Sequence, residues 1–306
     1  MGTFITDGAS VLPGVKTDAR PSTGASTEWA ATDANEVRSA LLDLRTAALA
    51  VQSGFVDPNV AMVIATGSDT PRALQDRFAD VVNVKDFGAT GLGGLDDTAA
   101  IQAAIDSLAA TGGTVYFPPG QYLVTAINLA GPYTTCLAGS EVERTVLLGT
   151  TGTTGPVLSI DGNYISEVVI RQMTVDMWAN AANATGIMLK NGARRCLFEK
   201  VQVIGNDESH KLVSVGDSVT ASHDVAFNSC ELDGDGYVYV CGGSLSTEPT
   251  YSVSFNKCRL GIVDALNVAA LVIRGGTING AATVSHTALI KLRTARGVTI
   301  DRKRHV

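Results

Sequence analysis

The sequence predicts a mainly β protein: a right-handed parallel β-helix, preceded by short α-helices and an extended arm. Three observations carry this prediction. Large apolar residues recur every 28 or 29 residues through the second half of the chain. Glycine is abundant, at 32 of 306 residues, and β-branched residues, Asn and Asp are frequent, which favours short strands joined by tight turns. Patterns typical of helices occur only in the first 110 or so residues.

The repeat is clearest at four anchor residues: Ile170, Phe198, Phe227 and Phe255. Apolar or sulfur side chains follow three and five residues after each anchor, with polar residues between them. Because strand side chains alternate, one repeat would form one coil, and equivalent residues of successive coils would stack about 4.8 Å apart. We therefore expect an internal stack of the three phenylalanines and a hydrogen bond between the stacked amides of Asn228 and Asn256.

The N-terminal part divides into two segments. Residues 1–32 are polar and rich in Gly, Ser, Thr and Pro, and they predict an extended arm that attaches to other proteins. Residues 33–53 predict a helix whose apolar residues follow a heptad spacing. The alternatives are an amphipathic helix packed on its own domain and a self-associating helix. The residues predicted to make the self-association are Val37, Leu41, Leu44, Ala48 and Val51.

Elements of the linker and the first coil follow in order. A short helix is expected from Asp69 or Thr70, with Pro71 in its first turn, and then a strand from Val81 to Val84. Asp96 and Asp97 are expected to cap a helix by accepting from its free N–H groups. A strand over 114–117 follows. The predicted domains are thus the arm 1–32, the helical segment 33–80 and the β-helix 81–306.

Composition and residue spacing argue against several classes of partner and cofactor. A net charge of −7 argues against a nucleic-acid partner. Five cysteines without CxxC spacing predict unpaired, mostly buried thiols, and the four histidines lack metal-ligand spacing, so no cofactor or metal is expected. Neither a signal peptide nor a membrane-spanning apolar run is visible, which predicts synthesis in a cytoplasm and no membrane partner.

Residues 81–122 contain a strand ending in Asp86–Ala89, an Asp-Asp-Thr helix start at 96–98, Ile101-Gln102, and a Gly-Gly-Thr-Val-x-Phe-Pro-x-Gly-x-Tyr run at 112–122. This pattern resembles the opening of the pectate-lyase-like β-helix superfamily, in particular the module of phage tailspikes and tail fibres. Residues 72–80 resemble the linker that precedes the module in such proteins. The resemblance implies a homotrimeric spike or fibre of a virion, assembled in the host cytoplasm, that acts in adsorption or anchors a distal fibre at its C-terminal end.

The resemblance leaves an enzymatic alternative, a lyase or hydrolase of capsule or lipopolysaccharide. A hydrolase needs two carboxylates beside the sugar bond. Asp176 and Asp233 fall at equivalent positions two coils apart, about 10 Å by strand spacing, and Asp235 is close by; the plainer interpretation is turn chemistry. Trp178 and Tyr237 are candidate glycan contacts. The wider set of residues after the strands also includes Asp207, Glu208 and Asp264. No complete catalytic signature is present, so an adsorption or structural role on host glycans is expected.

Overall fold

The computed structural model describes residues 37–46, 62–64, 67, 69–130, 135–162, 166–217, 220–242, 249–278 and 290–301. The chain divides into two units, Met1–Ala61 and Met62–Val306. In the first unit a helix covers 37–46, inside the predicted range, and every residue of it is exposed. Ala48, Val51 and the arm 1–32 lie outside the described residues. None of the described helices is long and apolar enough to cross a membrane.

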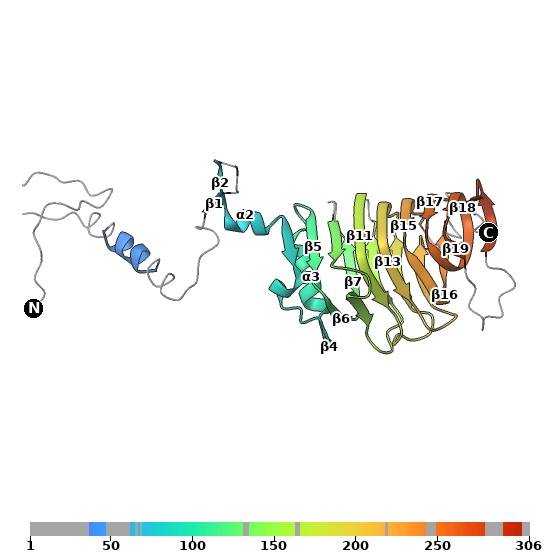
Figure 1. Ribbon diagram of the computed structural model, residues 1–306, viewed down its shortest axis with the longest axis horizontal. Helices are drawn as coiled ribbons and strands as arrows, with labels where there is room; N and C mark the ends of the chain where they lie inside the picture. The colour runs from blue at the N-terminus through green and yellow to red at the C-terminus, as the bar shows by residue number, and fades with distance from the viewer. Residues whose placement is uncertain are drawn as a thin grey trace, which may run out of the picture. The chain divides into compact units, whose positions relative to one another are not determined.

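The second unit is a parallel β-helix, as predicted (Figure 1). Its strands form three parallel sheets that run along the coil. Sheet 1 contains β3 (Val81–Asn83), β5 (Gly113–Phe117), β8 (Thr135–Gly139), β11 (Ser166–Asp176), β13 (Arg194–Ile204), β15 (His223–Asn228), β17 (Thr250–Asn256), β18 (Arg259–Arg274) and β21 (Thr299–Asp301).

The other two sheets share the longer strands, which bend from one sheet into the next. Sheet 2 contains β4 (Leu92–Asp96), β6 (Gly120–Val124), β9 (Thr145–Gly149), parts of β11, β13, β16 and β18, and β19 (Thr277–Ile278). Sheet 3 contains β7 (Ile127–Ala130), β10 (Pro156–Asp161), β12 (Thr185–Lys190), β14 (Lys211–Val215), β16 (Glu231–Cys241), part of β18, and β20 (Ile290–Arg296).

The predicted internal stack is confirmed. Ile170, Phe198, Phe227, Phe255 and Ile273 are register partners on successive coils, and the first four are fully buried. The phenylalanine rings are parallel within 10°, with centroids 4.5 and 4.9 Å apart. Asn256 Nδ2 donates to Asn228 Oδ1 at 3.0 Å, as expected for stacked amides at a bend. All five cysteines are free thiols, and four are buried.

The sharp bend between sheets 1 and 2 is made by one left-handed residue per coil. Gln172, Lys200, Ser229 and Lys257 occupy this position, with φ between 51° and 56°. A single residue in this conformation turns the chain without interrupting the pairing on either side. Outward polar residues of sheet 2 then form a hydrogen-bonded chain across the coils, in which Thr174 donates to Gln202, Gln202 donates to Glu231, and Glu231 pairs with Arg259.

One expectation for the segment before the β-helix was wrong. Pro71 does not begin a helix: it lies in strand β2 (Pro71–Ala73), which pairs antiparallel with β1 (Met62–Ile64), and α2 begins only at Leu74 and ends at Phe78. A proline offers no N–H, so it is tolerated at the edge of such a two-stranded ribbon. The predicted strand from Val81 ends at Asn83, and a 3-10 helix covers Val84–Phe87.

The capping role of Asp97 is also corrected. It precedes α3 (Thr98–Ser107), but its side chain makes no capping bond. The buried carboxylate instead accepts from the N–H groups of Thr90 and Gly91, at 2.7 and 3.0 Å, and so holds the preceding loop. Asp96 accepts from the Thr98 N–H at 2.9 Å, so Asp96 does cap a free N–H group in the first turn of α3.

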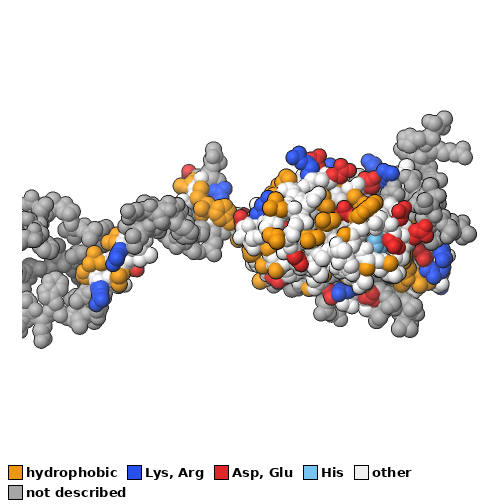
Figure 2. Space-filling view, turned by 90° about the horizontal axis from the view of Figure 1, so that it is seen from below, with side chains coloured by type: hydrophobic (Ala, Val, Ile, Leu, Met, Phe, Trp, Pro, Cys, Tyr) orange, Lys and Arg blue, Asp and Glu red, His pale blue; other side chains and the backbone are white. Residues whose placement is uncertain are grey.

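Helix α3 covers the first coil of the β-helix (Figure 1). It buries Ile101, Ala104 and Ile105 against the core, while Gln102 bonds the backbone N–H and C=O of Asn128 at 3.0 and 2.9 Å. Because β7 is the first strand of sheet 3, these bonds satisfy backbone groups at a sheet edge. Exposed apolar side chains also gather at the N-terminal end of this unit (Figure 2), and those of β3 and β4 include Val81, Leu92 and Leu95.

Candidate glycan-binding face

The predicted turn residues lie where the chain passes from sheet 2 to sheet 3. Asp176 ends β11, and its carboxylate accepts from the Trp178 N–H at 2.8 Å. Asp207 has the same arrangement one coil later, since it accepts from the Ser209 N–H at 2.8 Å. The Ser209 hydrogen bonds hold the pKa of Asp207 below its ordinary value. Both aspartates therefore stabilise their own turns, which agrees with the plainer interpretation of these residues.

The register places Asp176 and Asp233 two coils apart, as predicted. Asp176 is opposite Ile204, and the next coil pairs Val203 with Leu232, the residue before Asp233. The side chain of Asp233 is outside the described set. Asp235 donates its backbone N–H to Gly205 at 3.2 Å. The indole of Trp178 is 65% exposed and available to a ligand, but it lies on a turn rather than on a sheet face.

The outer face of sheet 3 holds the richest combination of aromatic and charged groups. Its central column, which register places on successive coils, consists of Asn128, Ser159, Met188, Ser214, Tyr239, Asp264 and Lys291. Tyr237 and Tyr239 of β16 are separated by the buried Val238, so alternation directs both phenols outward. Their rings meet edge to face, with centroids 6.2 Å apart.

A cation accompanies the two tyrosines. The Lys211 ammonium lies 5.0 Å from the centroid of the Tyr239 ring, within cation–π range. An ammonium has three N–H donors, so those that do not point at the ring remain available to a ligand. Burial raises the pKa of the Tyr239 phenol above its ordinary value, and contact with Cys241 raises it further. Burial and then the charge of Asp264 raise the pKa of Tyr237 as well. Both phenols are therefore protonated hydrogen-bond donors at neutral pH.

The next coil continues the face with an ion pair. Asp264 stands beside Tyr239 in the register, and its two oxygens accept from Arg293 Nη2 at 2.9 and 2.7 Å. The hydrogen bonds that Arg293 donates to Asp264 raise the pKa of the guanidinium above its ordinary value. The carboxylate is thus fixed in place by the guanidinium, in a geometry suited to orienting ligand hydroxyl groups.

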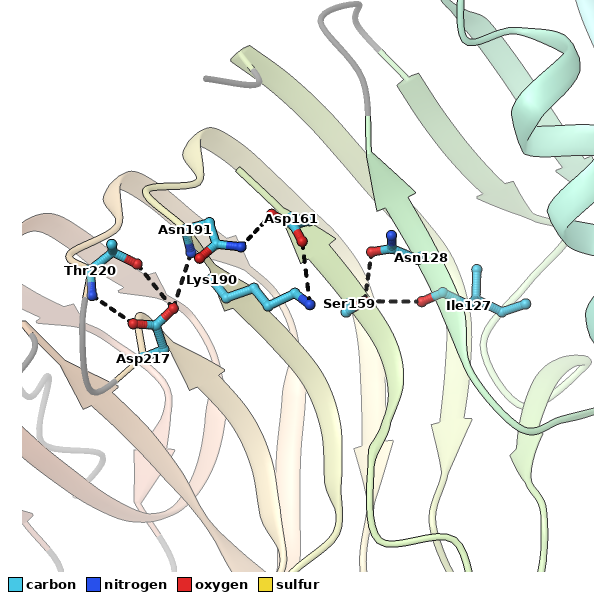
Figure 3. A network of polar contacts seen from close by, with 8 residues as sticks. All are labelled: Ile127, Asn128, Ser159, Asp161, Lys190, Asn191, Asp217 and Thr220. Carbon is cyan, nitrogen blue, oxygen red and sulfur yellow. Dashed lines mark hydrogen bonds and ion pairs between the residues drawn. The ribbon is translucent and has the colours of Figure 1, made fainter. Parts of the chain in front are cut away.

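At the N-terminal half of the same face the polar groups form a network (Figure 3). Ser159 Oγ donates to Asn128 Oδ1 at 2.8 Å, and Lys190 pairs with Asp161 at 3.3 Å. Asn191 connects two carboxylates, since its side chain donates to Asp161 and its backbone N–H donates to Asp217. Asp217 in turn accepts from the backbone and hydroxyl of Thr220. This network holds the turns at the edge of sheet 3 in place.

Carboxylate spacing decides what this face can do. Asp161 and Asp217 lie two coils apart, about 10 Å by strand spacing, but Asn191 bonds to both. Asp264 lies four coils from Asp161, about 19 Å by the same spacing. A glycosidase pair would stand about 5–9.5 Å apart with a reacting group between. The face therefore presents hydrogen-bond donors, ring faces and paired ions, an arrangement suited to binding sugars.

Among the described residues, no group of three or more His, Cys, Asp or Glu side chains could hold a metal ion. His210 is buried, and its Nε2 lies 3.0 Å from the Ala181 carbonyl. His223 stacks on Tyr251 with ring centroids 4.3 Å apart. His210 and His223 are therefore both packed inside the fold.

Sequence reasoning found Tyr237 but missed the partners that make it a site: Lys211, Tyr239 and Arg293. The repeat had been anchored on sheets 1 and 2, where the period is 28 or 29. On sheet 3 the outward residues Met188, Ser214, Tyr239 and Asp264 recur at spacings of 26, 25 and 25. That second, shorter period is a signal in the sequence that could have located the face.

Comparison with known proteins agrees with the fold. Residues 81–284 match the family described as rhamnogalacturonase A/epimerase, pectate lyase-like. Mannuronan C5-epimerase AlgE6 of Azotobacter vinelandii is 46% identical over 114 residues, covering 33% of this chain and 13% of that protein. AlgE1 of the same organism is 34% identical over 209 residues, covering 58% and 14%. The chain thus spans only a small part of these relatives.

A solved structure shares the architecture. Tailspike protein 3 of bacteriophage CBA120 superposes with a TM-score of 0.55 at 16% identity, covering 81% of this chain and 41% of that chain. At this identity the likeness concerns the fold alone, a right-handed β-helix.

Proposed function

Because the chain belongs to the rhamnogalacturonase A/epimerase, pectate lyase-like family, we propose that it binds a polysaccharide on the outer face of sheet 3, as the adsorption module of a phage particle. The observation that carries the proposal is the cluster of Tyr237, Tyr239 and Lys211, in which the two rings and the ammonium share one outward face and are each half-buried. Aromatic rings pack on the apolar faces of sugars, and phenols and ammonium groups donate to their oxygens.

The proposal favours binding without cleavage. A general base must be deprotonated near the working pH, but the raised pKa values of Tyr237 and Tyr239 keep both phenols protonated. Asp264 is engaged by Arg293, and Asp176 by its own turn. These four groups are therefore protonated or already bonded, which supports retention of an intact chain.

A second function, modification of a polyuronate, is favoured by one specific observation. The curated relatives include several mannuronan C5-epimerases and an alginate lyase, at 34–46% identity over the matched segments. Lys211, beside the tyrosines, would neutralise a uronate carboxylate in either function. The two functions differ in whether the polymer is changed.

The assembly and location are further parts of the proposal. Exposed Val37, Leu41 and Leu44 on the helix over 37–46 support self-association into a homotrimer, and the number three comes from the resemblance to tailspikes. The resemblance within 72–122 supports a place in a virion, with residues 1–32 attached to other particle proteins and a further protein at the C-terminal end.

The test incubates the purified protein with alginate and with capsular polysaccharide of candidate hosts. Binding is measured by titration calorimetry, and the polymer is then assayed for new reducing ends, for unsaturated uronate and for altered uronate stereochemistry. We expect binding with an unchanged polymer. Binding with a changed polymer would replace the adsorption role by the enzymatic one, and absence of binding to every polysaccharide would refute both.

A further inference from the structure

The outer face of sheet 1 has one layout on five successive coils. Each of β11, β13, β15, β17 and β18 presents three outward residues: one at the first edge, one in the centre and one at the second edge. The first-edge residues all have left-handed φ values, which makes the same bulge on every coil; they are Glu167, Arg195, Asp224, Ser252 and Ala270. The second-edge residues are Arg171, Glu199, Asn228, Asn256 and Arg274.

The centre of this face is largely apolar. Its column contains Val169, Leu197, Ala226, Ser254 and Val272, all half-buried. The equivalent column of sheet 3 contains a serine, a tyrosine, an aspartate and a lysine instead. An apolar stripe with charged borders, repeated along several coils, is typical of a protein–protein contact.

Charges at the two edges alternate in a complementary way. On β11 the first edge is Glu167 and the second edge is Arg171; on β13 the order is reversed, with Arg195 first and Glu199 second. Within the chain, Arg195 pairs with Glu167 at 3.3 Å, and their side chains remain 56% and 52% exposed. These groups can therefore contact a second molecule while they keep their partner within the chain.

We propose that copies of this chain pack side by side, parallel and in register, through the outer face of sheet 1. When three copies surround an axis parallel to the β-helix with this face inward, the first edge of one copy lies beside the second edge of the next. At equal height Glu167 then meets Arg171, and Arg195 meets Glu199. On the remaining coils at least one residue of each facing pair is neutral, so no like charges meet.

The same charges exclude a shifted packing. A slip of one coil places Glu167 opposite Glu199 in one direction and Arg195 opposite Arg171 in the other. Both are like-charge contacts, which disfavour the shifted arrangement. In this proposal the sheet 1 face therefore supplies the register of the assembly.

This inference deepens the assembly part of the proposed function and rests on it, and the experiment keeps assembly and glycan binding apart. A first-edge variant carries Glu167→Arg with Arg195→Glu, and a second-edge variant carries Arg171→Glu with Glu199→Arg. A third variant carries all four changes. Each variant retains opposite charges between neighbouring coils of its own chain, so its circular dichroism spectrum should match that of the wild type.

Sedimentation velocity and light scattering at low salt measure the assembly of the full-length proteins. We expect an oligomer for the wild type, a dissociation constant at least about tenfold higher for each edge variant, and recovery in the four-change variant. A monomeric wild type, an edge variant that assembles normally, or a four-change variant that does not recover would overturn the proposal. Polysaccharide titration of the dissociated variants reports separately on sheet 3.

Discussion

Sheets 1 and 3 are built from the same coils, yet their outward faces carry different chemistry. On sheet 1 the central column is apolar with charged edges, whereas on sheet 3 it is polar and aromatic, with Tyr239 and Asp264 on neighbouring coils. The inward residues are alike, since both sheets bury aliphatic or aromatic side chains against one core. The comparison shows that inward positions determine the coil, while outward positions are free to serve separate surfaces.

The largest effect should come from the shared interior. Phe227 is fully buried between Phe198 and Phe255. Phe227→Ala should lower the free energy of unfolding by about 3–5 kcal/mol, because it leaves a cavity within a parallel ring stack. The matched control is Ala226→Ser on the outward side of the same strand, which should change stability by less than about 0.5 kcal/mol. Denaturant titration at one protein concentration measures both; equal effects would show that the stack is not the core of the coil.

A smaller effect on stability is expected from Asp97 in the first coil. Asp97 is 3% exposed and accepts from both Thr90 and Gly91. Asp97→Asn should cost about 1.5–3 kcal/mol, since one acceptor oxygen is replaced by an amine that faces N–H donors. Thermal unfolding would measure this loss. A variant as stable as the wild type would mean that the carboxylate does not hold the loop.

The role of Asp96, which precedes Asp97, should appear in the pH dependence of the free energy of unfolding. The hydrogen bond from the Thr98 hydroxyl holds the pKa of Asp96 below its ordinary value of 3.8. A depressed pKa in the folded state means that the contribution is complete above pH 3.8 and is lost as the pH falls through the folded value. Asp96→Asn should therefore make the free energy of unfolding less dependent on pH in the acid range. Near neutral pH, its pH dependence should be the same as in the wild type. An unchanged pH dependence in the acid range would contradict this role.

How far the sequence predicted these features depends on periodicity. The anchors at 170, 198, 227 and 255 were predicted with their register, because buried residues in a coil must recur and stack. The Asn228–Asn256 bond followed from the same register. The sheet 3 face was not predicted, because its residues are polar, differ from coil to coil, and follow a shorter spacing than the anchors. Tyr237 was singled out by its place after a strand, but its neighbours Lys211 and Arg293 come from other coils.

The errors at the N-terminal coil have a different cause. Asp97 has the sequence context of a helix cap, but its carboxylate reaches back to a loop six and seven residues earlier. Pro71 has the context of a helix start, but pairing with Ile64 places it in a strand. In both cases a contact with a residue six or seven positions earlier in the chain overrides the helix-start preference that the immediate neighbours indicate.

The most direct test of the central claim compares the two faces by polysaccharide affinity. Tyr237→Ala and Lys211→Ala alter sheet 3, whereas the first-edge variant, Glu167→Arg with Arg195→Glu, alters sheet 1. With the polysaccharide that binds the wild type, we predict that each sheet 3 variant raises the dissociation constant by about tenfold, the loss of a ring contact or a charge-assisted hydrogen bond of roughly 1.4 kcal/mol. Per subunit, the sheet 1 variant should bind as the wild type does. Unchanged affinity in both sheet 3 variants, or a loss only in the sheet 1 variant, would contradict the assignment of glycan binding to sheet 3.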